Sequence, residues 1–228
     1  VVPTSRINNR TQISRKSVIV SGTQDTVNTA GRNQELAYQI SKNAKELKRD
    51  MELVLCNNQS AAVGGAAAAR TSSGLASWIQ TNISAIGANG ATGGVVTEAQ
   101  LKGVAASCWN SGGDPSMIML GSFNKQKLSG FTGGSTKMTQ ADDKKLVAAI
   151  DIYESDFGSM TVVPNRFSRS RDVFVLQPDM WAVAYLRDFQ MIDLAKTGDA
   201  EKKAMLAEYT LVAKNEAANG AIFDLTTA

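Results

Sequence analysis

The chain of 228 residues is 43% hydrophobic and carries 24 Lys and Arg against 21 Asp and Glu, which gives a net charge of +3 and a pI near 8.9. This length supports one large domain or two intertwined ones, and the mild charge falls short of the concentrated basic patch of a dedicated nucleic-acid-binding protein. Histidine is absent, so His-dependent catalytic triads, zincin motifs and His-containing metal clusters are excluded.

Residues 1–28 are expected to be extended, because β-branched residues mix with polar and basic ones and alternate locally. The segment begins at Val1 without a methionine, as expected of a processed product, a trimmed sequence or a fragment. Four basic residues on it are candidates for contact with nucleic acid, but ion pairs with acidic neighbours or simple solvation account for them better. They are Arg6, Arg10, Arg15 and Lys16.

The stretch Gly31–Cys56 is predicted to form the longest helix, and the rest of the chain is expected to be arranged along it. Its apolar residues recur at steps of three and four and so share one face, opposite a charged face. Thr29 or Asn33 is the expected N-cap. About 25 residues at ~1.5 Å each make a rod of roughly 38 Å, whose apolar stripe another segment must cover. The stripe comprises Leu36, Ile40, Ala44, Leu47, Met51 and Val54.

Residues 57–94 are dominated by Ala, Gly, Ser, Thr and Asn, which predicts loops and turns. This composition fits a flexible loop or a surface packed against a copy of the same chain. Gly87–Gly93 superficially resembles a phosphate-binding loop but lacks the strand and helix context and the GK[ST] of a P-loop, so no phosphate site is predicted. Isolated apolar residues are expected to anchor the segment to a core, namely Leu75, Trp78, Ile79 and Ile83.

A compact α/β segment is predicted to follow. Thr97 caps a helix whose apolar positions continue to Cys108, and Gly112–Pro115 ends it. A buried strand is predicted at Met117–Leu120 and a second helix from Ser122 to about Phe131. From Lys145 onward, strands are predicted at Leu146–Tyr153, Gly158–Pro164 and Asp172–Leu176.

Two polar clusters near these strands are weak candidates for a functional site. The acids lack a matched acid–base partner and are interpreted as solvated loop residues. The arginines are interpreted as an ion-pair cluster in preference to a phosphate site. The acids are Asp151, Glu154 and Asp156, and the arginines are Arg166, Arg169 and Arg171. No catalytic, cofactor-binding or metal-binding residue is therefore predicted.

Two further properties of the sequence indicate the cellular compartment in which the protein folds. No apolar run approaches the ~20 residues that cross a bilayer, and no signal peptide is apparent, so the chain is expected to be soluble. Cys56 and Cys108 form no CxxC motif, and two free, inert thiols in a reducing setting are expected.

The C-terminal part, Met180–Leu225, is predicted to contain antiparallel strands. Apolar runs at Trp181–Leu186 and Met205–Val212 flank the polar turn Leu194–Asp199, and a third run lies at Ala221–Phe223. We expect these strands to cover the apolar stripe of the long helix, so that the two distant segments form one domain.

The order of several motifs resembles that of tailed-bacteriophage major capsid proteins of the Hong Kong 97-type fold, and the resemblance covers nearly the whole chain. Its firmest parts are the turn LAKTGD with EYTL and the SGTQ that leads into the long helix. The motifs are RTQI at 10–13, VSGTQ at 20–24, KELKRDME at 45–52, LAKTGD at 194–199, EYTL at 208–211 and KNEA at 214–217.

This resemblance implies an α+β fold in which a long spine helix lies against a β-sheet in a peripheral domain, beside an α/β axial domain and an extended loop. It assigns residues 1–28 to the returning limb of the extended loop and 29–59 to the spine helix. Residues 60–165 become the axial domain, and 166–228 the peripheral sheet and C-terminus. The arm and outgoing limb of the family would precede Val1.

The implied function is structural and non-enzymatic. The subunit would self-assemble as hexamers and pentamers into an icosahedral head around double-stranded DNA, through many weak repeated contacts. The implied location is the virion, after assembly in the host bacterial cytoplasm. The implied partners are scaffold, portal and decoration proteins and packaged DNA, contacted without sequence specificity, and no membrane. The alternatives are an encapsulin-type compartment shell, a DNA-binding decoration protein, and an enzyme or small-ligand-binding α/β protein built on residues 97–165.

Overall fold

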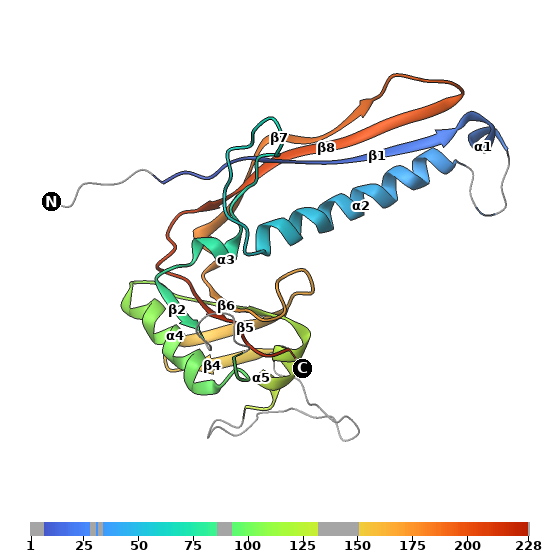
Figure 1. Cartoon of the computed structure of the whole chain (residues 1–228). Coiled ribbons are helices and arrows are strands. Elements are labelled where there is room, and N and C mark those ends of the chain that lie inside the picture. Colours follow the sequence, from blue (N-terminus) through green and yellow to red (C-terminus); the bar gives the residue numbers. More distant parts are fainter. Residues whose placement is uncertain (1–6, 28–30, 32–33, 86–92, 132–150, 228) are drawn as a thin grey trace. The chain divides into compact units, whose positions relative to one another are not determined.

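The structure, a computed structural model, describes residues 7–27, 31, 34–85, 93–131 and 151–227. The chain divides into two compact units, each made of segments that are distant in sequence (Figure 1). The first unit comprises residues 1–74 and 183–212, and the second comprises residues 75–182 and 213–228.

A three-stranded sheet forms the centre of the first unit. Its order is β1 (Gln12–Ser21), β8 (Ala200–Ala213) and β7 (Trp181–Asp193). β1 pairs antiparallel with β8 along its whole length. The strands predicted on either side of the LAKTGD turn are thus confirmed. Gly198 within that turn has φ 88°, a left-handed conformation that glycine adopts without steric cost.

Helix α2 (Glu35–Cys56) runs along β1 in Figure 1 and is the predicted long helix. It begins at Glu35 instead of Gly31, and Gln34 at its N-cap makes no side-chain capping bond. The carboxylate Oδ1 of Asp25, in the short and unpredicted helix α1 (Gly22–Thr26), accepts a hydrogen bond from the Leu36 amide at 3.4 Å. An acid from another element therefore helps to satisfy the helix start. The predicted caps, Thr29 and Asn33, lie outside the described residues.

The apolar stripe of α2 is covered by the sheet, as predicted. Leu47 is 1% exposed, and Met51 packs against Ala207 and Tyr209 of β8. Of the remaining stripe residues, Leu36, Ile40, Ala44 and Val54 are half-buried. On the same side, Lys16 of β1 pairs with the acids Glu46 and Asp50 of the helix at 3.4 and 2.9 Å.

The second unit contains a mixed six-stranded sheet. Its order is β2 (Asn82–Ala85), β9 (Gly220–Phe223), β6 (Val173–Leu176), β3 (Met117–Leu120), β5 (Gly158–Pro164) and β4 (Ile152–Ser155). The pairs β2–β9 and β3–β5 are parallel, and the other three pairs are antiparallel. All four residues of β6 are buried, as expected of an apolar strand covered on both faces.

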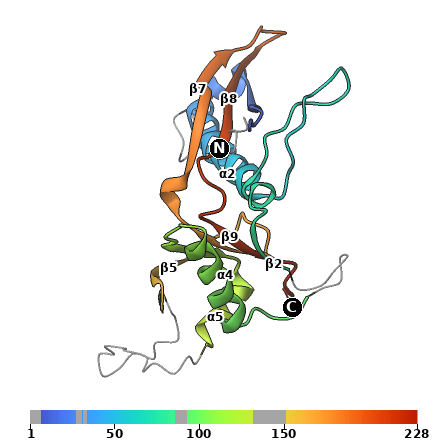
Figure 2. The same cartoon turned by 90° about the vertical axis from the view of Figure 1, so that its left-hand side faces the viewer.

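Within the described part of this unit, three α-helices and one 3-10 helix, η2 (Pro178–Met180), accompany the sheet. Helix α4 (Glu98–Asn110) packs beside β9 and β2 (Figure 2), with Leu101, Ala105 and Cys108 fully buried. The other helices are α3 (Leu75–Trp78) and α5 (Ser122–Ser129). The predicted cap is confirmed, because Thr97 forms a reciprocal capping box with Gln100.

The unit boundaries differ from those expected from the sequence. Strands β6 and β9 pair with β3 and β2 in the six-stranded sheet. Residues 166–182 and 213–228 therefore fall in the second unit, although β7 and β8 of the three-stranded sheet begin at Trp181 and end at Ala213. Residues 60–74, in turn, belong to the first unit. Short apolar runs such as Val173–Leu176 show that a strand is buried but not which sheet it joins.

Two of the four apolar residues predicted to anchor the small-residue segment after α2 are buried in the structure. Leu75 and Ile79 are buried and Trp78 is partly so, whereas Ile83 is 41% exposed. The anchor prediction for Ile83 is wrong, since it lies on β2 at an edge of the sheet. The residues at the start of the predicted strand Leu146–Tyr153 lie outside the described residues, and the strand observed there, β4, begins at Ile152.

Candidate assembly surfaces

The two polar clusters singled out in the sequence do not line the groove described below. Asp151 is 82% exposed and pairs with Lys125 at 3.2 Å, while Glu154 and Asp156 are exposed. In the part of the chain that the structure describes, no three acidic or cysteine side chains gather as metal ligands would. Residues 86–92, most of the glycine-rich loop considered for phosphate, lie outside that part.

The arginine cluster is an ion-pair network for two of its three members. Arg169 pairs with Asp224 at 2.5 Å, and Arg171 lies 3.7 Å from the same carboxylate. Asp172 is fully buried, 3.8 Å from Arg169, and neither of its carboxylate oxygens has a hydrogen-bond partner. Burial raises the pKa of Asp172 to about 6; the neighbouring Arg169 charge lowers it and the Asp224 charge raises it. Arg166 is exposed.

This buried acid makes the stability of the second unit pH-dependent. The pKa of Asp172 is about 6 when folded and about 4 when unfolded, so its stabilising contribution is complete below pH ~4 and is lost as the pH rises through 6. Asp172→Asn should remove this dependence and raise the free energy of unfolding at pH 7.5 by up to ~3 kcal/mol.

Urea unfolding at pH 5 and 7.5 measures the effect of Asp172→Asn. All 3 tryptophans, Trp78, Trp109 and Trp181, lie in the second unit, so their fluorescence reports on it alone. Asp151→Asn, at an exposed acid, is the matched control and should behave as wild type. An Asp172→Asn protein that keeps the wild-type difference between the two pH values would refute the assignment.

A buried carboxylate in the first unit joins three segments, and the sequence reading did not single it out as a site. Glu208 of β8 accepts hydrogen bonds from Thr11 at 2.7 Å, from Arg187 of β7 at 2.8 Å, and from Arg70. Burial raises the pKa of Glu208, but these hydrogen bonds and the two arginine charges outweigh burial and lower it. The sequence does contain a sign of this site: Glu208 lies within the apolar run LAEYTL. A charged side chain in a buried strand requires a buried partner.

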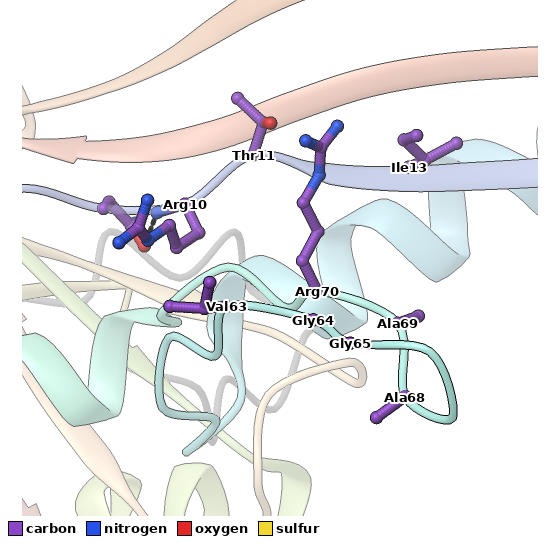
Figure 3. A pocket seen from close by; sticks show the side chains of 10 residues that line it. Arg10, Thr11, Ile13, Val63, Gly64, Gly65, Ala68, Ala69 and Arg70 are labelled. Atoms are coloured by element: carbon purple, nitrogen blue, oxygen red, sulfur yellow. Dashed lines mark hydrogen bonds between the residues drawn. The ribbon is translucent and has the colours of Figure 1, made fainter.

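The loop that carries Arg70 is fastened to the sheet and borders a groove of about 750 Å³ (Figure 3). Asn9 donates to the Leu211 carbonyl at 2.8 Å and accepts from the Ser73 amide at 2.8 Å. Arg70 rises from the loop beside Thr11 in Figure 3. The groove lies between the start of β1 and the loop, and its lining is Asn9, Arg10, Thr11, Ile13, Val63, Gly64, Gly65, Ala68, Ala69 and Arg70.

The surface of the first unit combines basic and apolar side chains. The outer face of α2 exposes Lys42, Lys45 and Arg49 between Tyr38 and Leu53, both 48% exposed. Strand β7 exposes six large apolar side chains. Neither cysteine forms a disulfide: Cys108 is buried, which raises its pKa to about 11, and Cys56 is half-buried. No helix in the described ranges is long and apolar enough to cross a membrane.

A long helix laid along a three-stranded sheet, joined to an α/β unit with a mixed six-stranded sheet, is the fold of Hong Kong 97-type capsid proteins. A protein of the cyanophage A-1(L) capsid matches with a TM-score of 0.69 and 14% identity, over 95% of this chain and 78% of that one. The SrpI encapsulin of Synechococcus elongatus PCC 7942 matches with a TM-score of 0.63 and 9% identity, over 94% of this chain and 74% of the other. At these identities the likeness concerns the fold alone.

Sequence comparison gives the family. The sequence model of the SU10 major capsid protein family matches residues 1–226, and the chain belongs to that family. A relative, the major capsid protein of Escherichia phage Phieco32, is 27% identical over 269 residues, covering 97% of this chain and 76% of its own length. The resemblance to phage major capsid proteins is thereby confirmed, and the encapsulin alternative is less supported.

Proposed function

We propose that this major capsid protein is the repeating subunit of an icosahedral phage head, assembling as hexamers and pentamers around double-stranded DNA. The observation that carries the proposal is the family match across residues 1–226. The exposed apolar and basic surfaces of the first unit support it, since a shell subunit must contact copies of itself through many weak, repeated interfaces.

In this proposal the first unit is the peripheral domain with α2 as its spine helix, and the second unit is the axial domain. Residues 1–28 form the returning limb of the extended loop. The subunit catalyses no reaction and holds no cofactor. It assembles in the host bacterial cytoplasm with scaffold and portal proteins, accepts decoration proteins, and contacts packaged DNA through phosphates only, without sequence preference.

Assembly of the purified protein tests the proposal. We expect rings and closed shells in negative-stain micrographs, either from the protein alone or after co-expression with the head proteins of its phage. A protein that remains a small monomer under both conditions would overturn it. Shells that enclose an enzyme instead of DNA would support the encapsulin-type compartment, the second candidate, because this chain shares its fold with the SrpI encapsulin as well as with phage capsid proteins.

A further inference from the structure

Strand β7 leaves large apolar side chains exposed on both of its faces. The strand is 13 residues long, about 44 Å at ~3.4 Å per residue, and β8 is its only strand partner among the described residues (Figure 2). Its large apolar side chains are between 36% and 67% exposed. They are Val183, Tyr185, Leu186, Phe189, Met191 and Ile192, which we call the β7 strip.

The strip is not part of the core of its own unit. The Tyr185 and Phe189 rings lie 6.0 Å apart, and Lys48 of α2 reaches over the Phe189 ring at 5.7 Å. These side chains therefore contact one another and a lysine, while Leu186 at 67% and Met191 at 54% remain open to water. An exposed, long apolar edge strand promotes association.

The charges around the strip restrict what can cover it. Asp188 and Asp193 are exposed on the same strand, the second with 80% of its side chain in water. The strand's basic residue, Arg187, is engaged by Glu208. Asp193 pairs with Lys203 of β8 at 3.4 Å, so Asp188 is the acid beside the strip that has no ion pair among the described residues. Its charge favours a partner that presents both apolar and basic side chains.

A second copy of this chain meets that requirement. Its first unit exposes basic residues next to apolar ones on α2, where Lys42, Lys45 and Arg49 lie between Tyr38 and Leu53. Arg10 and Arg15 are likewise exposed near Ile13, itself 43% exposed. Building on the proposed function, we propose that the β7 strip is a subunit–subunit contact of the shell, covered by a neighbouring copy of the same chain.

A photo-cross-linking residue in place of Leu186 tests the contact directly. Illuminated shells should give a band of twice the subunit mass on a denaturing gel, with cross-linked peptides from this chain alone, and unassembled protein should give none. Shells that yield only single subunits, or only cross-links to a different protein, would overturn the proposal.

A paired substitution separates this inference from the proposed function. Leu186→Lys with Ile192→Lys should reduce shell yield at least tenfold, whereas the control Leu186→Ile with Ile192→Val should assemble as wild type. Both side chains are exposed in the subunit, so neither pair should shift its thermal unfolding midpoint by more than about 2 °C. Lysine variants that assemble normally would refute the contact but leave the proposed function intact. A wild-type protein that fails to assemble would refute the function itself.

Discussion

Leu47→Asp in helix α2 should leave the first unit unfolded. Leu47 is 1% exposed. Its replacement by aspartate would remove a buried apolar side chain and put a charged carboxylate among apolar side chains. We expect a loss of about 4–5 kcal/mol, comparable with the whole stability of a small domain. Loss of hydrogen-exchange protection in β8 together with lower helical circular dichroism would show the effect.

Lys45→Glu on the exposed face of the same helix is the matched control. Its side chain is exposed, so the free energy of unfolding should change by less than about 0.5 kcal/mol. Ile40→Asp should fall between the two, because Ile40 is only half-buried. If Leu47→Asp kept the wild-type exchange pattern, the packing of α2 against the sheet would be wrong.

Glu208→Gln should destabilise the first unit by about 2–3 kcal/mol. The amide would keep the shape of the side chain but remove the charge, leaving Arg70 and Arg187 without their shared carboxylate. We expect the 59–74 segment to lose hydrogen-exchange protection first, because Arg70 joins it to β8. Both thermal unfolding and peptide-resolved exchange measure this.

Glu201→Gln in the same strand is the control for the charge change. Glu201 pairs with Lys196 on the exposed side of the hairpin, and an exposed ion pair contributes less than about 1 kcal/mol. Equal effects at positions 201 and 208 would mean that the buried network around Glu208 does not stabilise the fold.

The elements that were predicted correctly from the sequence are those whose signal lies in neighbouring residues. The α2 stripe, the Thr97 cap, the strand Gly158–Pro164 and the β7–β8 hairpin are each read from neighbouring residues, and the structure contains all of them. The order of the motifs predicted the capsid fold, and the similarity to known capsid proteins confirms it.

Features that depend on long-range pairing were missed. Nothing local shows that Val173–Leu176 pairs with β3 and β9, since any buried strand has the same apolar character. Glu208 is similar, because its partners Thr11 and Arg70 are 197 and 138 residues away. The acid that caps α2, Asp25, precedes the Leu36 amide by 11 residues and belongs to a helix too short for periodicity to predict.

The order in which the strands are synthesised has a consequence for folding in the cell. β8, the central strand of its sheet, begins at Ala200, and β9, an inner strand of the other, begins at Gly220. A nascent chain therefore displays α2, β1 and most of the second unit while both sheets still lack an inner strand. The first unit stays incomplete until β8 ends at Ala213, and the second until β9 ends at Phe223. A chain made only as far as β7 therefore has neither sheet in the form needed to join a shell.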